Sequence, residues 1–244
     1  MKSIILEEKI DWKGVISYAL YDWASSPVPT LHATFIFAVY FTTTISPENG
    51  TSYWGYMTAL ASLSVALTAP FLGALADARS IRKFLLFVFT ILGVFSTMSL
   101  WFIYPDNNLI LFALVISFFS IVSMELTFVF YNSLLPSVAE PSQIGRVSGF
   151  AWGCGYFGAI FCLAIALFVF ILNDTPPFGL LKSDAGPVRA TMVLSSFWFL
   201  IFSLPAFIFI REIKKSNTSL KPLTRLNEGL KTILKIPGML RFMI

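Results

Sequence analysis

The chain has 244 residues, of which 57% are hydrophobic and only 12% are charged, and its formal net charge is +4. A mean hydropathy of +0.78 excludes a soluble globular domain and indicates a membrane protein with several spans. The basic residues border the apolar runs and do not line one face, so the positive charge does not indicate nucleic-acid binding.

Residues 1–13 form a charged lead-in, and no separate short apolar segment precedes the first apolar run, so no cleavable signal peptide is expected. The first run, residues 14–45, would be ~45 Å long as a continuous helix, which exceeds the ~30 Å hydrocarbon core. Pro27 and Pro29 predict a bend near its middle. Five further membrane helices are predicted at residues 53–76, 84–104, 109–135, 147–172 and 190–210.

The basic residues predict how these helices are oriented. Fifteen of the 17 lie before the first span, between the second and third, between the fourth and fifth, or after residue 210. The other two, Lys182 and Arg189, lie between the fifth and sixth spans or at the start of the sixth. By the positive-inside rule, we expect both termini in the cytoplasm.

The region after the sixth predicted helix has two parts. Residues 211–238 are predicted to form a cytoplasmic linker with an amphipathic helix, because Leu and Ile recur at helical spacing with Arg and Lys elsewhere around the helix. Residues 239–244 resemble the start of a truncated seventh helix. The prediction is therefore an all-α membrane protein, with a six-transmembrane-helix bundle at residues 14–210 that forms the front half of a twelve-helix transporter.

The polar residues of the first predicted helix gather on one side. Asp22, Ser25, Ser26, Pro29 and His32 follow helical spacing. A carboxylate and an imidazole inside a membrane are costly unless they face protein or water. Both groups also exchange protons in the physiological range when their surroundings shift them. This face is a candidate path for a substrate or a proton.

The fourth predicted helix carries a second polar face. Glu125 and Asn132 are seven residues apart and therefore nearly superposed, with Tyr131 on a neighbouring face. Glu125 falls ~24 Å from the external end of the helix, in the cytoplasmic half of the membrane. An unpaired glutamate at that depth takes up a proton or seeks a cation. We expect these three residues to continue the same path.

Each of these polar residues has a structural alternative. His32 would then be a hydrogen-bonded packing histidine, and Glu125 would hydrogen-bond to a neighbouring helix. Asp22 would form an ion pair with a cation at the cytoplasmic end of the bundle, either Arg79 or Arg146.

The segment from Gly73 to Lys83 lies between two long apolar runs and contains Asp77, Arg79 and Arg82. Charges this dense do not lie in hydrocarbon, so the segment is predicted to be a short loop at the membrane surface. Gly73 would let the preceding helix end approach a neighbour closely. Asp77 is placed to meet a helix N-terminus or an arginine near the fourth helix.

This arrangement resembles the loop between the second and third helices of the major facilitator superfamily. The resemblance rests on Gly73, Ala76, Asp77, Arg82 and Lys83, whereas a serine replaces the second glycine of the family pattern. It implies that this loop acts, together with Arg79 and Arg146, as a conformational latch against the other half of a transporter.

Glycines at positions 145, 149 and 153 are spaced four residues apart along the fifth predicted helix. Membrane helices approach one another most closely across strips of small residues. We therefore expect Gly145, Gly149 and Gly153 to pack against another helix, and a second strip, which starts at Gly155 and is displaced around the helix, to offer a second face for tight packing. They do not indicate a phosphate site, because they lie inside a helix and do not precede one.

Three stretches together resemble one branch of that superfamily, the vacuole-effluxer-like family of fungi and bacteria. Ser25 stands where the family has asparagine. The resemblance implies the N-terminal half of a twelve-helix major facilitator fold, in the cell membrane of a bacterium or the vacuolar membrane of a fungus, with amino-acid efflux as the role of the fungal members. The matching residues are Tyr21, Asp22, Trp23 and Ala24, then Tyr131, Asn132, Leu135 and Pro136, then 145–149.

No Walker loop and no metal-spaced cluster of His, Cys and carboxylates is present in the sequence, so no cofactor, metal site or enzyme activity is expected. The leading hypothesis is a secondary transporter of small polar solutes that works by alternating access and is driven by a proton or ion gradient. Its partners would be the small-molecule substrate, membrane lipid and the missing C-terminal six-helix half. The other hypothesis is a six-span membrane scaffold without transport activity, or a truncated half-transporter product.

Overall fold

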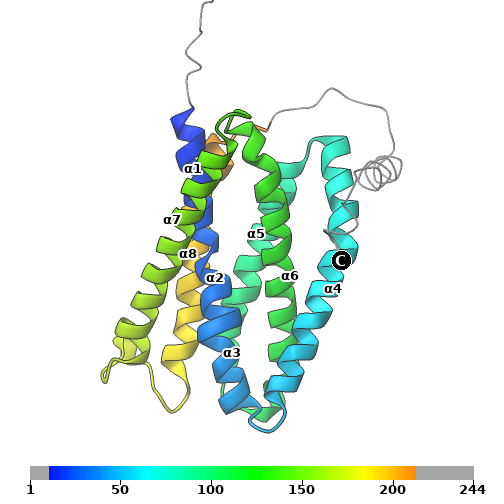
Figure 1. Ribbon diagram of the computed structural model, residues 1–244. Coiled ribbons are helices and arrows are strands. Elements are labelled where there is room, and N and C mark those ends of the chain that lie inside the picture. The colour runs from blue at the N-terminus through cyan, green and yellow to red at the C-terminus, as the bar shows by residue number, and fades with distance from the viewer. Residues whose placement is uncertain (1–10, 213–244) are drawn as a thin grey trace, which may run out of the picture.

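The computed structural model describes residues 11–212, which form one upright bundle of long helices with no strand in this part of the chain (Figure 1). Six stretches are long and apolar enough to cross a membrane, which confirms the predicted number of spans. They are Trp12–Ile45, Gly50–Arg79, Arg82–Phe102, Asn107–Ser137, Ile144–Ile171 and Gly186–Phe209.

The helical elements within these stretches follow the same order. The first stretch contains α1 (Trp12–Ser25), α2 (Pro27–Pro29), η1 (Thr30–Phe35), α3 (Phe37–Tyr40) and η2 (Phe41–Ile45). Beyond it lie α4 (Gly50–Arg79), α5 (Arg82–Ser99), η3 (Leu100–Phe102), η4 (Asn107–Leu109), α6 (Ile110–Leu134), η5 (Leu135–Ser137), α7 (Ile144–Ile165), η6 (Ala166–Ile171), η7 (Pro177–Gly179) and α8 (Gly186–Phe209).

The first span is interrupted where its two prolines lie, near the predicted position. Proline has no backbone N–H to donate, and the chain continues beyond Pro29 as a π-helix, η1, with wider turns. The Ile36 N–H accordingly donates to the Leu31 carbonyl, five residues back, at 3.0 Å. Because a π-turn holds more residues than an α-turn, side chains after Pro29 leave the face that an unbroken α-helix would give them.

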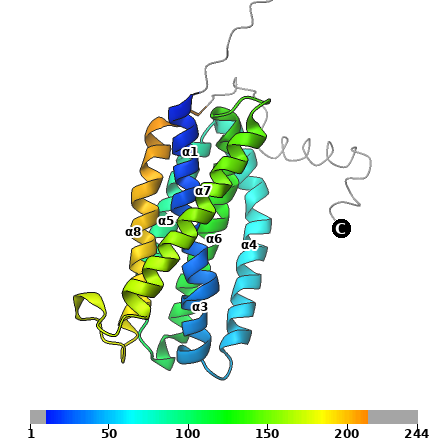
Figure 2. The ribbon, with the colours of Figure 1, turned by 60° about the vertical axis from the view of Figure 1, so that its left-hand side comes forward.

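The first span is the most enclosed of the six. Buried residues make up 44% of its most apolar window, against 11% for α4, and α4 stands at an edge of the bundle in both views (Figures 1 and 2). The α1 helix packs mainly against α7 and α8. The Tyr18 and Tyr131 rings stack between α1 and α6 at 4.1 Å, and the Tyr21 hydroxyl pairs with Thr90 of α5 at 2.6 Å. These contacts fix α1 between its neighbours.

Glycines bring α1 and α7 together, and they belong to the second predicted strip, which starts at Gly155, and not to the first. A Cβ at Gly158 would lie 2.5 Å from the Trp23 carbonyl oxygen, so only glycine permits this approach. In contrast, no described atom lies within 4 Å of a Cβ built at Gly145, Gly149 or Gly153. The first predicted strip therefore packs against no other helix of the described residues, because α7 turns its other side to α1.

The junction of α4 and α5 is closed by an ion pair. Arg82 Nε, at the start of α5, donates to Asp77 Oδ1, in the last turn of α4, at 2.7 Å, so Asp77 pairs across this junction and not with an arginine near the fourth span. The predicted loop is shorter than expected, since residues 73–79 belong to α4. Ser80 lies between Asp77 and Arg82 in the left-handed region, at φ 50°, where glycine is the ordinary choice. The close approach expected at Gly73 is absent, since no described atom lies within 4 Å of a Cβ there.

The start of α5 is tied to the end of α8. Glu212 accepts hydrogen bonds from the backbone N–H groups of Arg82, at 2.9 Å, and Lys83, at 3.3 Å. Lys83 in turn donates through Nζ to the Ile210 carbonyl at 2.6 Å. A carboxylate thus meets the positive end of one helix, and a cation meets the carbonyl end of the other. The predicted amphipathic helix and the start of a seventh span lie outside the described residues.

Candidate functional site

Two adjoining clefts open between the first span, α6 and α7. They have volumes of about 230 and 250 Å³ and share four lining residues, Asp22, Ser26, Pro29 and Phe128. The first cleft is completed by Thr30 and by three residues of α7, Trp152, Tyr156 and Ala159. The second is completed by Ser25 and Tyr21 of α1 and by Met124, Glu125 and Thr127 of α6. We call the two together the Asp22 cleft.

Asp22 is a deeply buried charged group of this cleft. The residue is only 4% exposed. Ser26 Oγ donates to Asp22 Oδ1 at 3.2 Å, whereas Oδ2 has no hydrogen-bond partner among residues 11–212. Gly155 of α7 packs against this carboxylate, since a Cβ there would lie 2.8 Å from Oδ1. A carboxylate buried with half of its acceptors unused is costly in a membrane, so the site favours a cation or a proton.

The structural alternative for Asp22 does not occur in the described part of the chain. The two ion pairs among residues 11–212 join Asp77 to Arg82 and Asp174 to Lys182. Arg79 and Arg146, the cations expected for that alternative, are exposed.

Glu125 supplies a second carboxylate to the cleft. It lies on the exposed face of α6 and takes part in neither of the two ion pairs found within the described ranges. Taken together, the two clefts are lined by two acidic residues, Asp22 in both and Glu125 in the second, and by no described lysine, arginine or histidine. The cleft is therefore anionic, as its two acidic side chains face no basic residue of its wall.

His32 lies away from this cleft, in an enclosed cluster of its own. Its Nε2 pairs with Ser117 Oγ at 3.0 Å, and its Nδ1 pairs with Ser120 Oγ at 3.3 Å. Ser120 pairs further with Thr97 of α5 at 2.8 Å. A neutral imidazole satisfies both contacts, with one nitrogen donating and the other accepting. We call these four residues the His32 cluster, and its geometry is that of a packing histidine.

Tyr131 and Asn132 also do not line the cleft. Tyr131 is buried behind it, where its ring stacks on Tyr18 and its hydroxyl donates to the Tyr18 carbonyl at 3.1 Å. Asn132 is exposed, and its Nδ2 donates to the Phe128 carbonyl at 2.9 Å. Of the seven residues expected along the path, Asp22, Ser25, Ser26 and Glu125 come together.

The sequence analysis missed the aromatic wall of the cleft. Trp152 and Tyr156 of α7 are both exposed, and their rings meet edge to face with centroids 6.0 Å apart. Phe128 of α6 lies in both clefts. A spacing of four residues between two aromatic side chains of α7 was the available signal, because it places both rings on one helix face.

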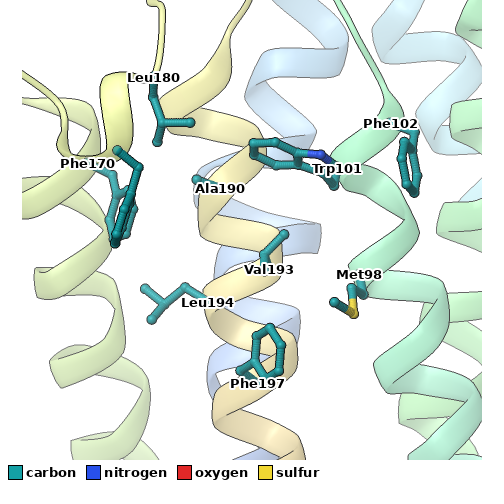
Figure 3. Close-up of a pocket in the computed structure, with 10 residues that line it drawn as sticks. Met98, Trp101, Phe102, Phe170, Leu180, Ala190, Val193, Leu194 and Phe197 are labelled. Atoms are coloured by element: carbon teal, nitrogen blue, oxygen red, sulfur yellow. The ribbon is translucent and has the colours of Figure 1, made fainter.

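Another cavity of the described bundle has a different character. It measures about 500 Å³ and lies among η3, η6 and α8, where Phe170, Trp101 and Phe197 face it (Figure 3). Its lining is apolar apart from the Trp101 indole nitrogen, so it offers a polar solute almost nothing to bind. Nearby, Arg189 is occupied by the Trp101 and Asp184 carbonyls, at 2.8 and 3.0 Å.

Comparison with known proteins identifies the family of the chain. Residues 38–244 match the family described as "Vacuole effluxer Atg22 like". The chain is 26% identical over 237 residues to an uncharacterized MFS-type transporter, YxiO, of Bacillus subtilis strain 168, covering 93% of this chain and 54% of that protein. It thus spans about half the length of this curated relative.

Two solved structures share the fold. One is the major facilitator proton:xylose symporter XylE bound to 6-bromo-6-deoxy-D-glucose, with a TM-score of 0.63 at 14% identity over 82% of this chain and 45% of that chain. The other is the inward-open xylose transporter XylE of E. coli, with a TM-score of 0.62 at 13% identity over 93% and 53%. At this identity the likeness shows the fold alone, which is half of a major facilitator bundle.

Proposed function

Because the chain belongs to the vacuole effluxer-like family, we propose that it provides one half of a secondary transporter that moves small polar solutes by alternating access. The observation that carries this proposal is the Asp22 cleft, in which two carboxylates that form no ion pair within residues 11–212 face a cavity between membrane-spanning helices. Ionisable groups inside a membrane are retained where they serve a substrate or ion path.

Within this proposal the cleft residues have different roles. Asp22 and Glu125 bind the cargo or the coupling proton, and Ser25 and Ser26 line the path beside them. Tyr131 holds α1 against α6, and the His32 cluster joins the first span to α5 and α6. These supporting contacts keep the cleft walls in register while the whole bundle moves.

The partner in this proposal is a C-terminal six-helix half, which would close the open side of the cleft. Two features support it. The related transporter is about twice as long as the matched region, and α7 exposes a glycine face at Gly149 and Gly153 that no described atom covers. Lipid would cover the remaining apolar surface, with both termini in the cytoplasm.

The α4–α5 loop acts in this proposal as a cytoplasmic latch. Asp77 is paired with Arg82 in this half-bundle, and Arg79 and Arg146 remain exposed for contacts with the partner half. Such contacts would exist in only one of the alternating states. Asp77→Asn keeps the shape and removes the charge, so transport should slow several-fold while cargo affinity in one locked state is unchanged. Loss of affinity at an unchanged conformational balance would contradict the latch.

The test of the proposed function is transport by the full protein in proteoliposomes. A pooled panel of amino acids and small metabolites is followed in uptake and efflux, with and without an uncoupler. The proposal predicts movement of at least one amino acid that the uncoupler reduces and that Asp22→Asn abolishes. If no solute of the panel crosses faster than in protein-free vesicles, transport of this kind is contradicted.

A further inference from the structure

We propose that the Asp22 cleft binds the ammonium group of an organic amine, with the amine's carbon skeleton against the aromatic wall. This inference rests on the proposed function and narrows its cargo to one chemical class. It follows from the charge of the cleft, from the unused carboxylate oxygen and from the aromatic rings beside them.

The charge of the cleft selects the sign of the ligand. Its lining holds two carboxylates and no basic residue. A carboxylate or phosphate ligand would meet only like charge from these walls, whereas an ammonium group would neutralise them. Asp22 also has unused hydrogen-bonding capacity, since its Oδ2 has no hydrogen-bond partner among residues 11–212, whereas Oδ1 accepts from Ser26. An ammonium group carries three donors, enough to reach Asp22 and a neighbouring hydroxyl.

The aromatic wall selects the same class of ligand. Trp152 and Tyr156 line the first cleft, and Phe128 lies in both. Aromatic faces attract cations through the ring quadrupole, and the contact is stronger where water is excluded. The same rings shield the apolar carbons of an amine from water. A metal ion is a poorer match, because the described residues contain no group of three or more His, Cys, Asp or Glu side chains that could hold one.

The size of the cleft sets the scale of the ligand. The two volumes, about 230 and 250 Å³, are together comparable to the smaller ligand pockets of proteins, roughly 300 to 1,000 Å³. An amine with a short branched or aromatic skeleton therefore fits, whereas a bare inorganic cation would leave the aromatic wall unused.

The test uses three probes that share one carbon skeleton. Isoamylamine carries only the ammonium group, leucine carries both charged groups, and 4-methylpentanoate carries only the carboxylate. Their binding to the full protein in lipid nanodiscs is measured by calorimetry at neutral pH. We expect isoamylamine and leucine to bind and 4-methylpentanoate to bind at least 10-fold more weakly.

Variants then locate the ammonium group. Asp22→Asn should weaken isoamylamine at least 10-fold, which corresponds to about 1.4 kcal/mol. Glu125→Gln and Trp152→Leu should each weaken it about 3-fold or more. Two matched controls should leave affinity unchanged: Asp106→Asn in an exposed loop, and Phe157→Leu on an exposed part of α7 that lines neither cleft.

Three results would overturn the inference. The first is binding of 4-methylpentanoate as tight as that of isoamylamine, and the second is no binding of isoamylamine at all. The third is an amine affinity that is unchanged in both single variants, Glu125→Gln and Asp22→Asn. If Asp22→Asn does not fold, the affinities of Glu125→Gln and Trp152→Leu decide the question. Because these assays need no transport cycle, amine binding without transport would contradict only the proposed function. Transport confined to anionic solutes would support the proposed transporter and contradict the inference that the cleft binds an amine.

Discussion

The first span carries two polar clusters that solve the cost of burial in opposite ways. In the His32 cluster both ring nitrogens have hydroxyl partners, and none of the four side chains lines a described cleft. In the Asp22 cleft Oδ2 of Asp22 has no hydrogen-bond partner among residues 11–212, and the carboxylate of Glu125 faces the same cavity. A satisfied buried cluster contributes stability, whereas an unsatisfied one lowers stability and is kept for binding. The first span therefore contributes both to a packing cluster, around His32, and to the candidate site, around Asp22.

The largest expected effect comes from a substitution in α7 that disturbs the Asp22 cleft and leaves the His32 cluster in place. In Gly158→Val the new Cβ would lie 2.5 Å from the Trp23 carbonyl oxygen, so α7 must move away from α1. We expect a loss of about 3 kcal/mol in the free energy of unfolding. Reversible unfolding in mixed detergent micelles measures this loss.

The matched control for that variant is Gly153→Val, on the same helix, where a Cβ meets no described atom within 4 Å. It should leave the stability of the bundle nearly unchanged. Equal losses in the two variants would show that helix propensity and not the contact with α1 is responsible.

A smaller effect contrasts the two clusters directly. His32→Leu keeps a similar volume but removes the partner of Ser117 and one partner of Ser120, so we expect a loss of about 2 kcal/mol. Asp22→Asn removes a buried charge that lacks a cation, so stability should be unchanged or higher. Unfolding of both variants at neutral pH is the measurement, and the reverse order of stabilities would break the comparison.

The smallest effect lies outside both clusters. Ser80 has a φ of 50°, where a residue with a Cβ is strained and glycine is not. Ser80→Gly should therefore raise the free energy of unfolding by about 0.5 to 1 kcal/mol and leave ligand binding unaltered. Thermal unfolding gives the shift, and a decrease in stability would mean that the serine side chain supports the loop.

The sequence predicted the number of spans because composition and hydropathy record burial in lipid directly. It also identified the carboxylates of the site, since Asp22 and Glu125 stand out in apolar runs. It did not separate His32 from Asp22. That prediction carried α-helical spacing through the predicted bend, whereas the π-turns of η1 after Pro29 turn the histidine toward α6.

The glycines of α7 show a second limit of sequence reasoning. The sequence predicted two strips, and it is the second, with Gly155 and Gly158, that contacts α1, whereas Gly149 and Gly153 of the first meet no described atom. Spacing shows which glycines share a face of a helix, and the position of the neighbouring helix decides which face is used. The aromatic wall escaped notice for a similar reason, because Trp152 and Tyr156 resemble ordinary membrane residues until the carboxylates opposite them are located.

The central claim is that the Asp22 cleft is a water-accessible binding path and the His32 cluster is closed packing. Two positions on α6 test it, the cleft-lining Glu125 and the fully buried Ser117. Glu125→Cys and Ser117→Cys are each made after replacing Cys154 and Cys162 by alanine, and a water-soluble methanethiosulfonate is added to the folded protein. We predict rapid modification at position 125, slowed by isoamylamine, and modification at position 117 only after unfolding. Equal rates at the two positions, or faster reaction at position 117, would contradict the account.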